Sequence, residues 1–497
     1  MSNIRVTYSG LIALLTSFLG VVTGTIFVLI VTRKLPVDEF GLWTLIGSLV
    51  SYVLVIEPII SYWTTRQLAR GEKIGKTAFY TNGFFSIGGF FAFLGIAFFV
   101  HTTSNVDLTV LLLASALIPL NFLTGVTTAI CHAHKPQAIS YATMFFEITK
   151  IPLGYLFVIF FQFGLFGAII ATIAAIAIKL SILLYFAKDL IIGQIQSQFI
   201  KFWLRLSWLP LYYSSSGLLH KLDILLFTTA TGSLIGPAYW GVSIAASSIV
   251  GQALNMSHGL YPKLIANKKQ EIVYENLKRT MFFAIPILAT SILFAKPVLH
   301  LLNPIYVDGI LIVYFLAIRT FLGIPLSMFY NVLQAYENVD ASITTKFSSF
   351  LKSKLFLVPT LHHIQSALYI STLAIFLYFL TSSEMSDVFL TTIWALVQLL
   401  TLLPFLLYGL FLVNSNYKIN FPMKEITKYS IVTLFSSIVI FFIMENFLTY
   451  PASIWEHIPQ MLFPLIIGGI MYFGIMYFID NSTRNLYKSI INEFKNK

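Results

Sequence analysis

Charged residues are scarce in this chain of 497 residues. Asp, Glu, Lys and Arg together make up 10% of it, whereas a typical soluble domain contains about 25%. Polar linkers are also missing, although a soluble chain of this length would normally be divided into several domains. Hydrophobic segments instead follow one another from Leu11 to Ile479, separated by short polar loops. The composition therefore excludes an ordinary soluble protein and predicts an integral membrane protein.

Several other features are nearly or entirely absent. The only cysteine, Cys131, excludes an internal disulfide. No long alternating pattern of strands is present, which disfavours a transmembrane barrel. The first apolar segment follows Arg5 and runs to about Val31, too long for a cleavable signal, so we interpret it as a spanning helix. No glycine-rich phosphate loop or sufficient set of metal ligands occurs, so neither a cofactor nor a metal is expected.

Apolar segments long enough to cross a bilayer recur along the whole chain. A hydrocarbon core of roughly 30 Å requires ~20 apolar residues in a helix. The sequence therefore predicts an all-α integral membrane protein with about fourteen transmembrane helices. The expected spans are 8–31, 43–63, 78–100, 108–131, 138–161, 163–187, 204–230, 237–260, 280–302, 308–333, 361–381, 388–413, 428–448 and 458–479.

Lys and Arg concentrate on one side of this predicted membrane. When the loops alternate between the two sides, 24 of the 31 basic residues fall on one side, 3 on the other and 4 within spans. Positive residues mark the cytoplasmic side, so both termini are expected to be cytoplasmic. Topology and attraction to anionic headgroups then explain the net charge of +11, and membrane lipids rather than nucleic acid are the expected partners. No loop is long enough for a catalytic domain, and no enzymatic activity is expected.

A weak internal repeat suggests two similar halves. An offset of 196 residues aligns 32–43 with 228–239 and 66–72 with 262–268, and an offset of 202 aligns 131–136 with 333–338. The letters match poorly, but each pair has the same place in the predicted topology. We therefore expect a six-helix lobe in residues 1–200, a second in 201–415, and two extra helices with a cytoplasmic tail in 416–497. Parallel repeats of this kind place a transport site between the halves.

Five segments, in this order and spacing, resemble a known family of membrane proteins. They are Val31–Leu45, Arg66–Lys73, Leu206–Phe227, Ile235–Val242 and Asn331–Asp340. The similarity is to the polysaccharide-transporter branch, which includes O-antigen flippases, of the multidrug/oligosaccharidyl-lipid/polysaccharide flippase superfamily, and it covers roughly the first twelve predicted spans. The resemblance implies a multi-pass protein of the cell (cytoplasmic) membrane. It also implies alternating access and export of a polyprenyl-linked oligosaccharide, with glycan-assembly proteins as candidate partners.

Charges within the predicted spans are the best candidates for function. A charge at the bilayer centre costs at least ~2.5–3.5 kcal/mol and normally faces protein or water. Lys179 is close enough to the cytoplasmic end of its span to be expected to snorkel to the interface. The candidate substrate path consists of Arg319, Lys221, Lys150, Asp223, Glu57, Glu147 and His220.

The spacing of these residues leaves alternatives open. Glu147 and Lys150 share a helix face, as a self-neutralising structural pair or as part of a substrate site. Lys221 and Asp223 point to different sides of their helix, so each needs a partner elsewhere, a wet cavity or a snorkelling position. Arg319 can bind a phosphate through two hydrogen bonds. Glu57 together with Pro58 indicates a kink, and Glu57 is also compatible with a protonated carboxyl that has a structural role.

The cations in different spans suit the neutralisation of a lipid-linked phosphate, and the resemblance favours the flippase. A cation-coupled small-molecule antiporter of the same superfamily is one alternative. A membrane polysaccharide polymerase is another, although such enzymes usually need a larger external loop than any found here. The sequence leaves the sugar, the carrier lipid and the energy source open.

Overall fold

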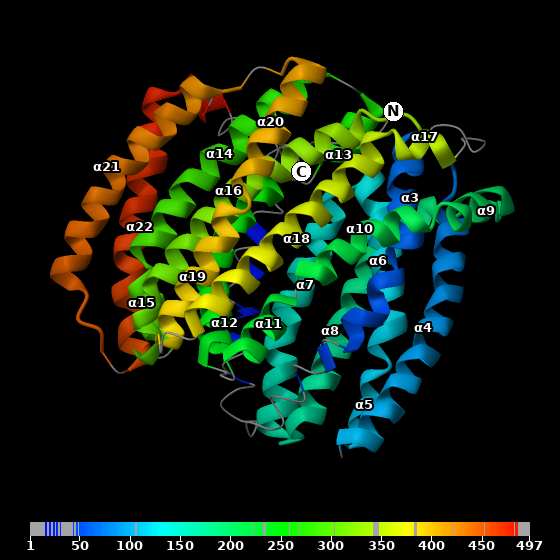
Figure 1. Cartoon of the computed structure of the whole chain (residues 1–497), viewed down its shortest axis with the longest axis horizontal. Helices are drawn as coiled ribbons and strands as arrows, with labels where there is room; N and C mark the ends of the chain where they lie inside the picture. The colour runs from blue at the N-terminus through cyan, green and yellow to red at the C-terminus, as the bar shows by residue number, and fades with distance from the viewer. Residues whose placement is uncertain are drawn as a thin grey trace. The chain divides into compact units, whose positions relative to one another are not determined.

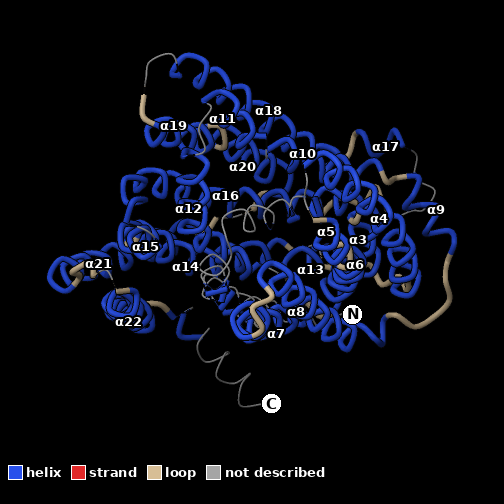
Figure 2. The backbone as a smooth tube through the Cα atoms, turned by 90° about the horizontal axis from the view of Figure 1, so that it is seen from below, coloured by secondary structure: helices blue, strands red, loops and turns tan. Residues whose placement is uncertain are grey.

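The computed structural model describes most of the chain. The described residues are 49–104, 107–220, 222–231, 235–257, 259–267, 269–302, 304–340, 347–381, 385–419, 421–451, 453–481 and 483–485, with isolated residues between 15 and 47. Every regular element in this part of the chain is a helix, and Figure 2 shows no strand there. The protein is an all-helical, multi-pass membrane protein.

The helices follow one another with short connections. In the first part of the chain they are η1 (Leu54–Ile56), α3 (Pro58–Ala69), α4 (Gly75–Ser104), α5 (Leu108–Ala114), α6 (Leu117–His134), α7 (Gln137–Gly154), η2 (Tyr155–Phe160), α8 (Gly164–Ala187), η3 (Lys188–Leu190), α9 (Ser197–Arg205) and α10 (Trp208–His220). In the rest they are α11 (Leu222–Thr231), α12 (Ile235–Ser247), η4 (Ser248–Ser257), α13 (Leu260–Ala266), α14 (Gln270–Leu293), α15 (Ala295–Leu302), η5 (Pro304–Gly309), α16 (Ile310–Ala335), α17 (Phe347–Leu351), α18 (Lys354–Leu380), α19 (Asp387–Leu400), α20 (Leu403–Tyr417), α21 (Met423–Phe447) and α22 (Ile454–Ile479).

Within the described residues, nine helical segments are long and apolar enough to cross a membrane. A tenth is counted if α14 and α15, which are bent by 60° relative to each other, form one span. The nine are Gly75–Thr102, Leu108–His134, Gln137–Phe160, Gly164–Leu190, Pro304–Ala335, Lys354–Leu380, Asp387–Tyr417, Met423–Phe447 and Glu456–Ile479.

The predicted spans from residue 78 onward all coincide with helices, but several are interrupted. The fourth, 108–131, is divided between α5 and α6, and the ninth, 280–302, is the bent pair. The eleventh begins at Lys354, seven residues before the predicted start at 361. The first span, 8–31, lies mostly outside the described residues.

Local sequence explains where α3 and α5 begin and end. Glu57 lies in a turn between η1 and α3, and Pro58 occupies the first turn of α3, where its missing N–H is tolerated. This confirms the predicted interruption of the second span. Gly71 follows the end of α3 with a φ of +98°, a conformation that glycine adopts without strain. The Asp107 carboxylate caps α5 by accepting a 2.8 Å hydrogen bond from the Thr109 N–H.

The chain divides into two compact units, and the division falls within α10, α16 and α18. Unit 1 consists of Met1–Ser215, His258–Lys268 and Ala335–Leu357, and unit 2 of Ser216–Ser257, Lys269–Gln334 and Val358–Lys497. Two short stretches from the second half of the sequence thus belong with the first. The six-helix lobes expected from the repeat stay a prediction.

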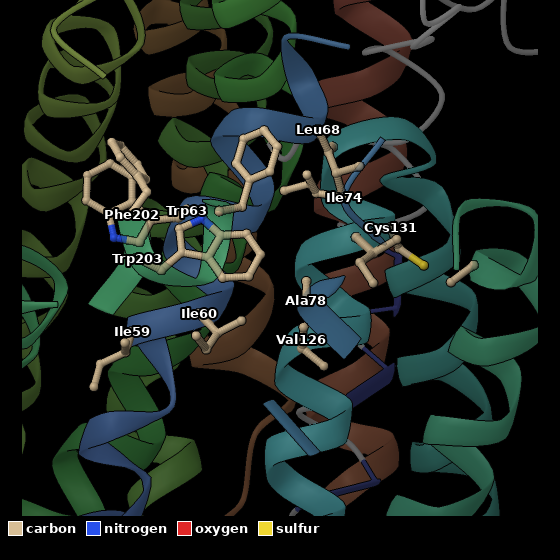
Figure 3. Packing of buried hydrophobic residues seen from close by; sticks show 14 of the residues in the cluster. Ile59, Ile60, Trp63, Leu68, Ile74, Ala78, Val126, Cys131, Phe202 and Trp203 are labelled. Carbon is tan, nitrogen blue, oxygen red and sulfur yellow. The ribbon is translucent and has the colours of Figure 1, made fainter. Parts of the chain in front are cut away.

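Unit 1 is held together by buried apolar and aromatic side chains. In one cluster, shown in Figure 3, residues of α3 meet α4, α6 and α9. The fully buried Trp63 ring lies edge-on to Phe202, with ring centres 5.3 Å apart. The Trp203 indole donates a 2.9 Å hydrogen bond to the Gln67 side chain. Close packing and such hydrogen bonds hold membrane helices together, because lipid tails are as apolar as the side chains.

Unit 2 contains an aromatic core and a peripheral helix pair. Trp240 on α12 stacks on Trp394 on α19 with ring centres 3.9 Å apart. The last two helices, α21 and α22, lie side by side in Figures 1 and 2 and also contact α14. There, the Tyr472 hydroxyl donates a 2.8 Å hydrogen bond to the Phe282 carbonyl. The two C-terminal helices are therefore packed against the rest of unit 2.

Large hydrophobic side chains are exposed along many of the helices. Such a surface would cause aggregation of a soluble monomer, whereas it suits contact with lipid. Examples on α4 and α21 are Phe84, Phe91, Phe98, Phe99, Ile431, Leu434, Phe435, Phe441 and Phe442.

Candidate functional site

In unit 1, α7 and α8 bring two cations to one carboxylate. Glu147 accepts a 2.8 Å hydrogen bond from the Lys150 ammonium and a 2.6 Å hydrogen bond from the Thr23 hydroxyl. The spacing of three residues therefore produces the ion pair that the sequence allows. Lys179 on α8 lies within electrostatic range of the same carboxylate. We call Glu147, Lys150 and Lys179 the unit 1 charge cluster; its formal charge is +1.

Aromatic rings flank this cluster. The Lys150 ammonium lies 5.5 Å from the centre of the Phe27 ring and 5.1 Å from that of Phe146. The Lys179 ammonium is 5.6 Å from the Phe146 ring, and the expectation that it snorkels to the interface stays a prediction. A cation gains from the face of an aromatic ring most when it is shielded from water. Lys179 can therefore remain among the helices.

Glu57 lies in a different part of unit 1. Its carboxylate accepts a 2.9 Å hydrogen bond from the Ser61 hydroxyl and a 3.2 Å hydrogen bond from the Asn82 amide. A Cβ atom on Gly125 would overlap the Glu57 carboxylate, so glycine leaves the space that this side chain occupies. No cation among the described residues forms an ion pair with Glu57.

In unit 2, a chain of hydrogen bonds ends at Asp223. The Trp394 indole donates to the Tyr369 hydroxyl at 2.5 Å, and this hydroxyl donates to Asp223 Oδ2 at 2.9 Å. Asp223 Oδ1 accepts from the Ile224 N–H at 2.8 Å. Neutral donors thus satisfy the buried carboxylate, and α11, α18 and α19 are joined through it.

Basic side chains surround this chain of hydrogen bonds. The His220 ring stacks on Tyr369 with centres 4.7 Å apart, and its Nε2 lies 3.0 Å from Gln398 Nε2. Arg319, about 14 Å along α16, is within electrostatic range of Tyr369 and Asp223. Its Nε is buried and has no hydrogen-bond partner among the described residues. We call His220, Asp223, Arg319, Tyr369 and Trp394 the unit 2 polar cluster.

His362 lies near this cluster and is not among the predicted site residues. The predicted eleventh span starts at 361, one residue before it. Since α18 begins at Lys354, His362 lies more than two turns inside the helix. Its ring is 4.9 Å from that of Tyr330, and it is within electrostatic range of His220.

A third ionic arrangement lies at the predicted cytoplasmic end of unit 1. Arg66, in the last turn of α3, bonds Asp340 through Nε at 2.5 Å and Nη2 at 2.9 Å. Arg70 bonds the same carboxylate at 2.7 and 2.9 Å. Arg66 Nη1 also donates to the Tyr261 hydroxyl of α13 at 2.6 Å. We call these four residues the Arg66–Asp340 cluster; the side chains of Arg66 and Asp340 are both 0% exposed.

Asp340 is ionised in this cluster. Burial alone would raise the pKa of its carboxyl, but the charges and hydrogen bonds of Arg66 and Arg70 outweigh burial and hold it well below its usual range. A carboxyl with a lowered pKa stabilises the fold above its unfolded pKa, and this contribution is lost only as the pH falls through the acidic range. The cluster therefore keeps its charges at neutral pH.

A rigid loop presents Asp340 to the two arginines. The Glu337 carboxylate accepts hydrogen bonds from the N–H groups of Asn338 at 2.9 Å, Val339 at 3.2 Å and Lys354 at 2.9 Å. This arrangement leaves the Glu337 carbonyl free to accept from Arg66 and Arg70, each at 3.2 Å. Nothing in the sequence indicates this pairing, which joins residues 274 positions apart.

The structure thus places the candidate path residues in three groups. Glu147 and Lys150 lie together, His220, Asp223 and Arg319 form a second group, and Glu57 is separate. Lys221 lies outside the described residues. No set of three or more His, Cys, Asp or Glu side chains in the described part of the chain could hold a metal ion.

Solved transporter structures share this helical arrangement. A crystal structure of MATE in complex with MaL6 has a TM-score of 0.66 at 13% identity, covering 82% of this chain and 96% of that chain. The Vibrio cholerae MATE transporter VcmN, in a mutant form, has a TM-score of 0.64 at 15% identity, covering 83% and 96%. The fold is that of the MATE transporters. An outward-facing multidrug resistance MATE transporter of the MOP superfamily has a TM-score of 0.62 at 12% identity, covering 82% and 96%.

At these identities the likeness to MATE structures establishes the fold alone. The superfamily expected from the sequence and its polysaccharide-transporter branch both stay predictions. No protein-family model matches the chain, and no curated protein matches it.

Proposed function

We propose that this protein is a flippase that moves a polyprenyl-linked oligosaccharide from the inner to the outer leaflet of the cell membrane. Transport proceeds by alternating access and supplies glycan units for a surface polysaccharide. In this proposal the chain has fourteen spans, arranged as two six-helix lobes and two additional helices, and both termini are cytoplasmic. No covalent reaction is required of it.

The chemistry of such a substrate defines what the protein must provide. A phosphate or pyrophosphate with attached sugars cannot cross about 30 Å of hydrocarbon unaided. Cations must neutralise its charge, and polar groups must replace the water around the sugars. The polyprenyl tail can remain in the lipid.

The buried Nε of Arg319, which has no hydrogen-bond partner in the described part of the chain, is the observation that carries the proposal. A charged side chain within the membrane normally faces a protein partner or water, because burying its charge is costly. Asp223 is already satisfied by Tyr369, so it leaves Arg319 available to an anion. A guanidinium can hold a phosphate through two parallel hydrogen bonds, which suits the head group of the proposed substrate.

The unit 1 charge cluster gives further support. Lys150 and Lys179 share a single carboxylate, so one positive charge is in excess. An anionic group of the substrate would neutralise it. The MATE fold also favours transport over the polymerase considered from the sequence.

A cation-coupled antiporter for small molecules is the second candidate. It is favoured by Glu57, a carboxylate with neutral donors and no ion-pair partner in the described residues. One of the similar structures is also named a multidrug resistance transporter. Under this alternative, Glu57 would exchange a proton or another cation for the transported molecule.

Depletion of the protein in cells tests the proposal. The leaflet in which lipid-linked oligosaccharide resides is scored with a membrane-impermeant sugar probe. We expect complete units to accumulate on the cytoplasmic face and surface glycan to be lost. Normal arrival of these units in the outer leaflet would contradict the flippase. Unpolymerised units outside would indicate a polymerase, and an unchanged glycan would favour the antiporter.

A further inference from the structure

The Arg66–Asp340 cluster joins segments that are far apart in the sequence. Arg66 and Arg70 lie at the end of α3, just after the second predicted span. Tyr261 is on α13, after the eighth predicted span, and Asp340 is in the loop after α16, the tenth. These segments were assigned to different lobes, yet the structure packs them together within unit 1.

The predicted repeat relates the two helix ends, of α3 and α13, that this cluster joins. An offset of 196 residues aligns 66–72, at the end of α3, with 262–268, in and after α13. Repeat-related helix ends approach each other near the axis that relates the two halves of a transporter. The hydrogen bond from Arg66 to Tyr261 is therefore a contact between corresponding ends, on the side where both termini are expected.

Charge and burial make the cluster better suited to a reversible contact than to permanent packing. Buried ion pairs recover little net stability, because both charges lose their water, and apolar residues of similar volume often serve as well. Parting of Arg66 and Asp340 costs less free energy when water reaches them, because both charges are rehydrated. In the observed state both side chains are 0% exposed, so access of water to this end requires the cluster to part.

We propose that the Arg66–Asp340 cluster is a cytoplasmic lock. It closes the cytoplasmic end of the transport path in the observed state, and it separates whenever that end opens. Arg66 is the central residue, because it contacts both Asp340 and Tyr261. Arg70 adds a second contact through a side chain that is 17% exposed, and the Glu337 turn holds Asp340 in place. The proposal rests on the transporter function but makes no use of the substrate's identity.

Cysteine labelling measures how often the cytoplasmic end opens, and it needs no substrate. Ala335, the last residue of α16, is fully buried in unit 1 and can be changed to cysteine. Inside-out membrane vesicles are treated with a membrane-impermeant maleimide, and the labelling rate at Ala335→Cys is followed. Removing both charges, with Arg66→Ala and Asp340→Ala, should raise this rate about tenfold or more, because a paired and buried contact is lost.

The chain contains two internal controls. Cys131 is fully buried against α8, with its sulfur 3.7 Å from the Leu183 carbonyl, so its labelling reports unfolding. The pair Lys135–Asp189 is also in unit 1, but it is exposed and its ions are 3.7 Å apart. Its removal by Lys135→Ala and Asp189→Ala should leave the rate at Ala335→Cys unchanged.

If the double variant also exposes Cys131, two milder variants test whether the cluster controls access to Ala335→Cys. Arg66→Lys keeps the charge but loses the two-pronged contact with Asp340, and Tyr261→Phe removes only the hydroxyl. Each should accelerate labelling at Ala335→Cys about two- to fivefold while Cys131 stays protected. Labelling at the original rate in both milder variants would overturn the lock. Because no sugar lipid is present, this result is independent of whether the protein is a flippase.

Discussion

The unit 1 charge cluster and the unit 2 polar cluster differ in how their carboxylates are satisfied. In unit 1, Glu147 and Lys150 are neighbours on one helix and form an ion pair. In unit 2, Asp223 receives its hydrogen bond from the neutral Tyr369, and the Arg319 Nε has no partner in the described residues. A pair close in sequence neutralises itself, whereas charges on separate helices can leave one member available for a ligand.

This difference assigns separate roles to the two groups. The Glu147–Lys150 pair is expected to matter for stability first and for transport only through the excess charge shared with Lys179. Arg319 is expected to matter for transport first. The predictions below test that division, beginning with the largest expected effect.

Neutralisation of Arg319 should have the largest effect on transport. Arg319→Gln is expected to reduce export of lipid-linked oligosaccharide about ten- to a hundredfold, because charged hydrogen bonds contribute about 1.5–3 kcal/mol. Insertion into the membrane should be unaffected. Export is measured as outer-leaflet oligosaccharide per molecule of inserted protein, and Arg319→Lys should retain part of it. Normal export by Arg319→Gln would remove the basis for the difference between the clusters.

Loss of the shared carboxylate in unit 1 should mainly reduce stability. Glu147→Gln leaves Lys150 and Lys179 without a counter-charge and is expected to cost about 2–3 kcal/mol, less than the loss of a partner from a fully buried pair. Lys150→Gln should cost below about 1 kcal/mol, since Lys179 and the Thr23 hydroxyl still face Glu147. Thermal unfolding in detergent compares the two variants. Equal losses would show that Lys179 does not share the carboxylate.

Glu57 offers a comparison, because its carboxylate forms no ion pair within the described residues. Gly125→Ala should destabilise the protein by about 1–3 kcal/mol, because the added methyl group meets the Glu57 side chain. Combining it with Glu57→Ala should recover most of the loss. Gly24→Ala is a matched control, since a Cβ there meets nothing within 4 Å. If the double variant is as unstable as the sum of its parts, the contact is not the cause.

The smallest effect is expected at Asp223. Asp223→Asn keeps an oxygen that can accept from the Tyr369 hydroxyl, so the cost should be about 1 kcal/mol or less. Asp223→Ala leaves that buried hydroxyl without an acceptor and should cost about 1–3 kcal/mol. The difference in unfolding midpoint between these variants measures the hydrogen bond itself. A loss in Asp223→Asn as large as that in Asp223→Ala would show that the charge of the carboxylate, and not this hydrogen bond, sets the cost.

Hydropathy predicted the helices well, because each spanning segment must form its backbone hydrogen bonds within its own helix and present apolar side chains to lipid. The Glu57–Pro58 break and the Glu147–Lys150 pair were also predictable, since both depend on residues within a few positions. Contacts between distant segments were not. Arg66 enters the sequence analysis through the topology, the repeat and the resemblance, and nothing in its neighbourhood indicates Asp340.

Two other positions depend on local detail. Lys179 lies near a helix end, where snorkelling is normally favourable, and the structure adds the Phe146 ring and the Glu147 charge near its ammonium. The predicted eleventh span starts at 361, too late for α18. Apolar composition does not change sharply there, so hydropathy could not locate the first turn at Lys354.

Reconstitution tests the central claim most directly. Purified protein is placed in liposomes containing a fluorescent polyprenyl-pyrophosphate oligosaccharide, and an impermeant quencher measures its movement between leaflets. We expect rapid exchange with the unmodified protein and exchange near the protein-free rate with Arg319→Gln. Movement at the protein-free rate with the unmodified protein, or equal movement by both proteins, would contradict a flippase that holds its substrate's phosphate through Arg319.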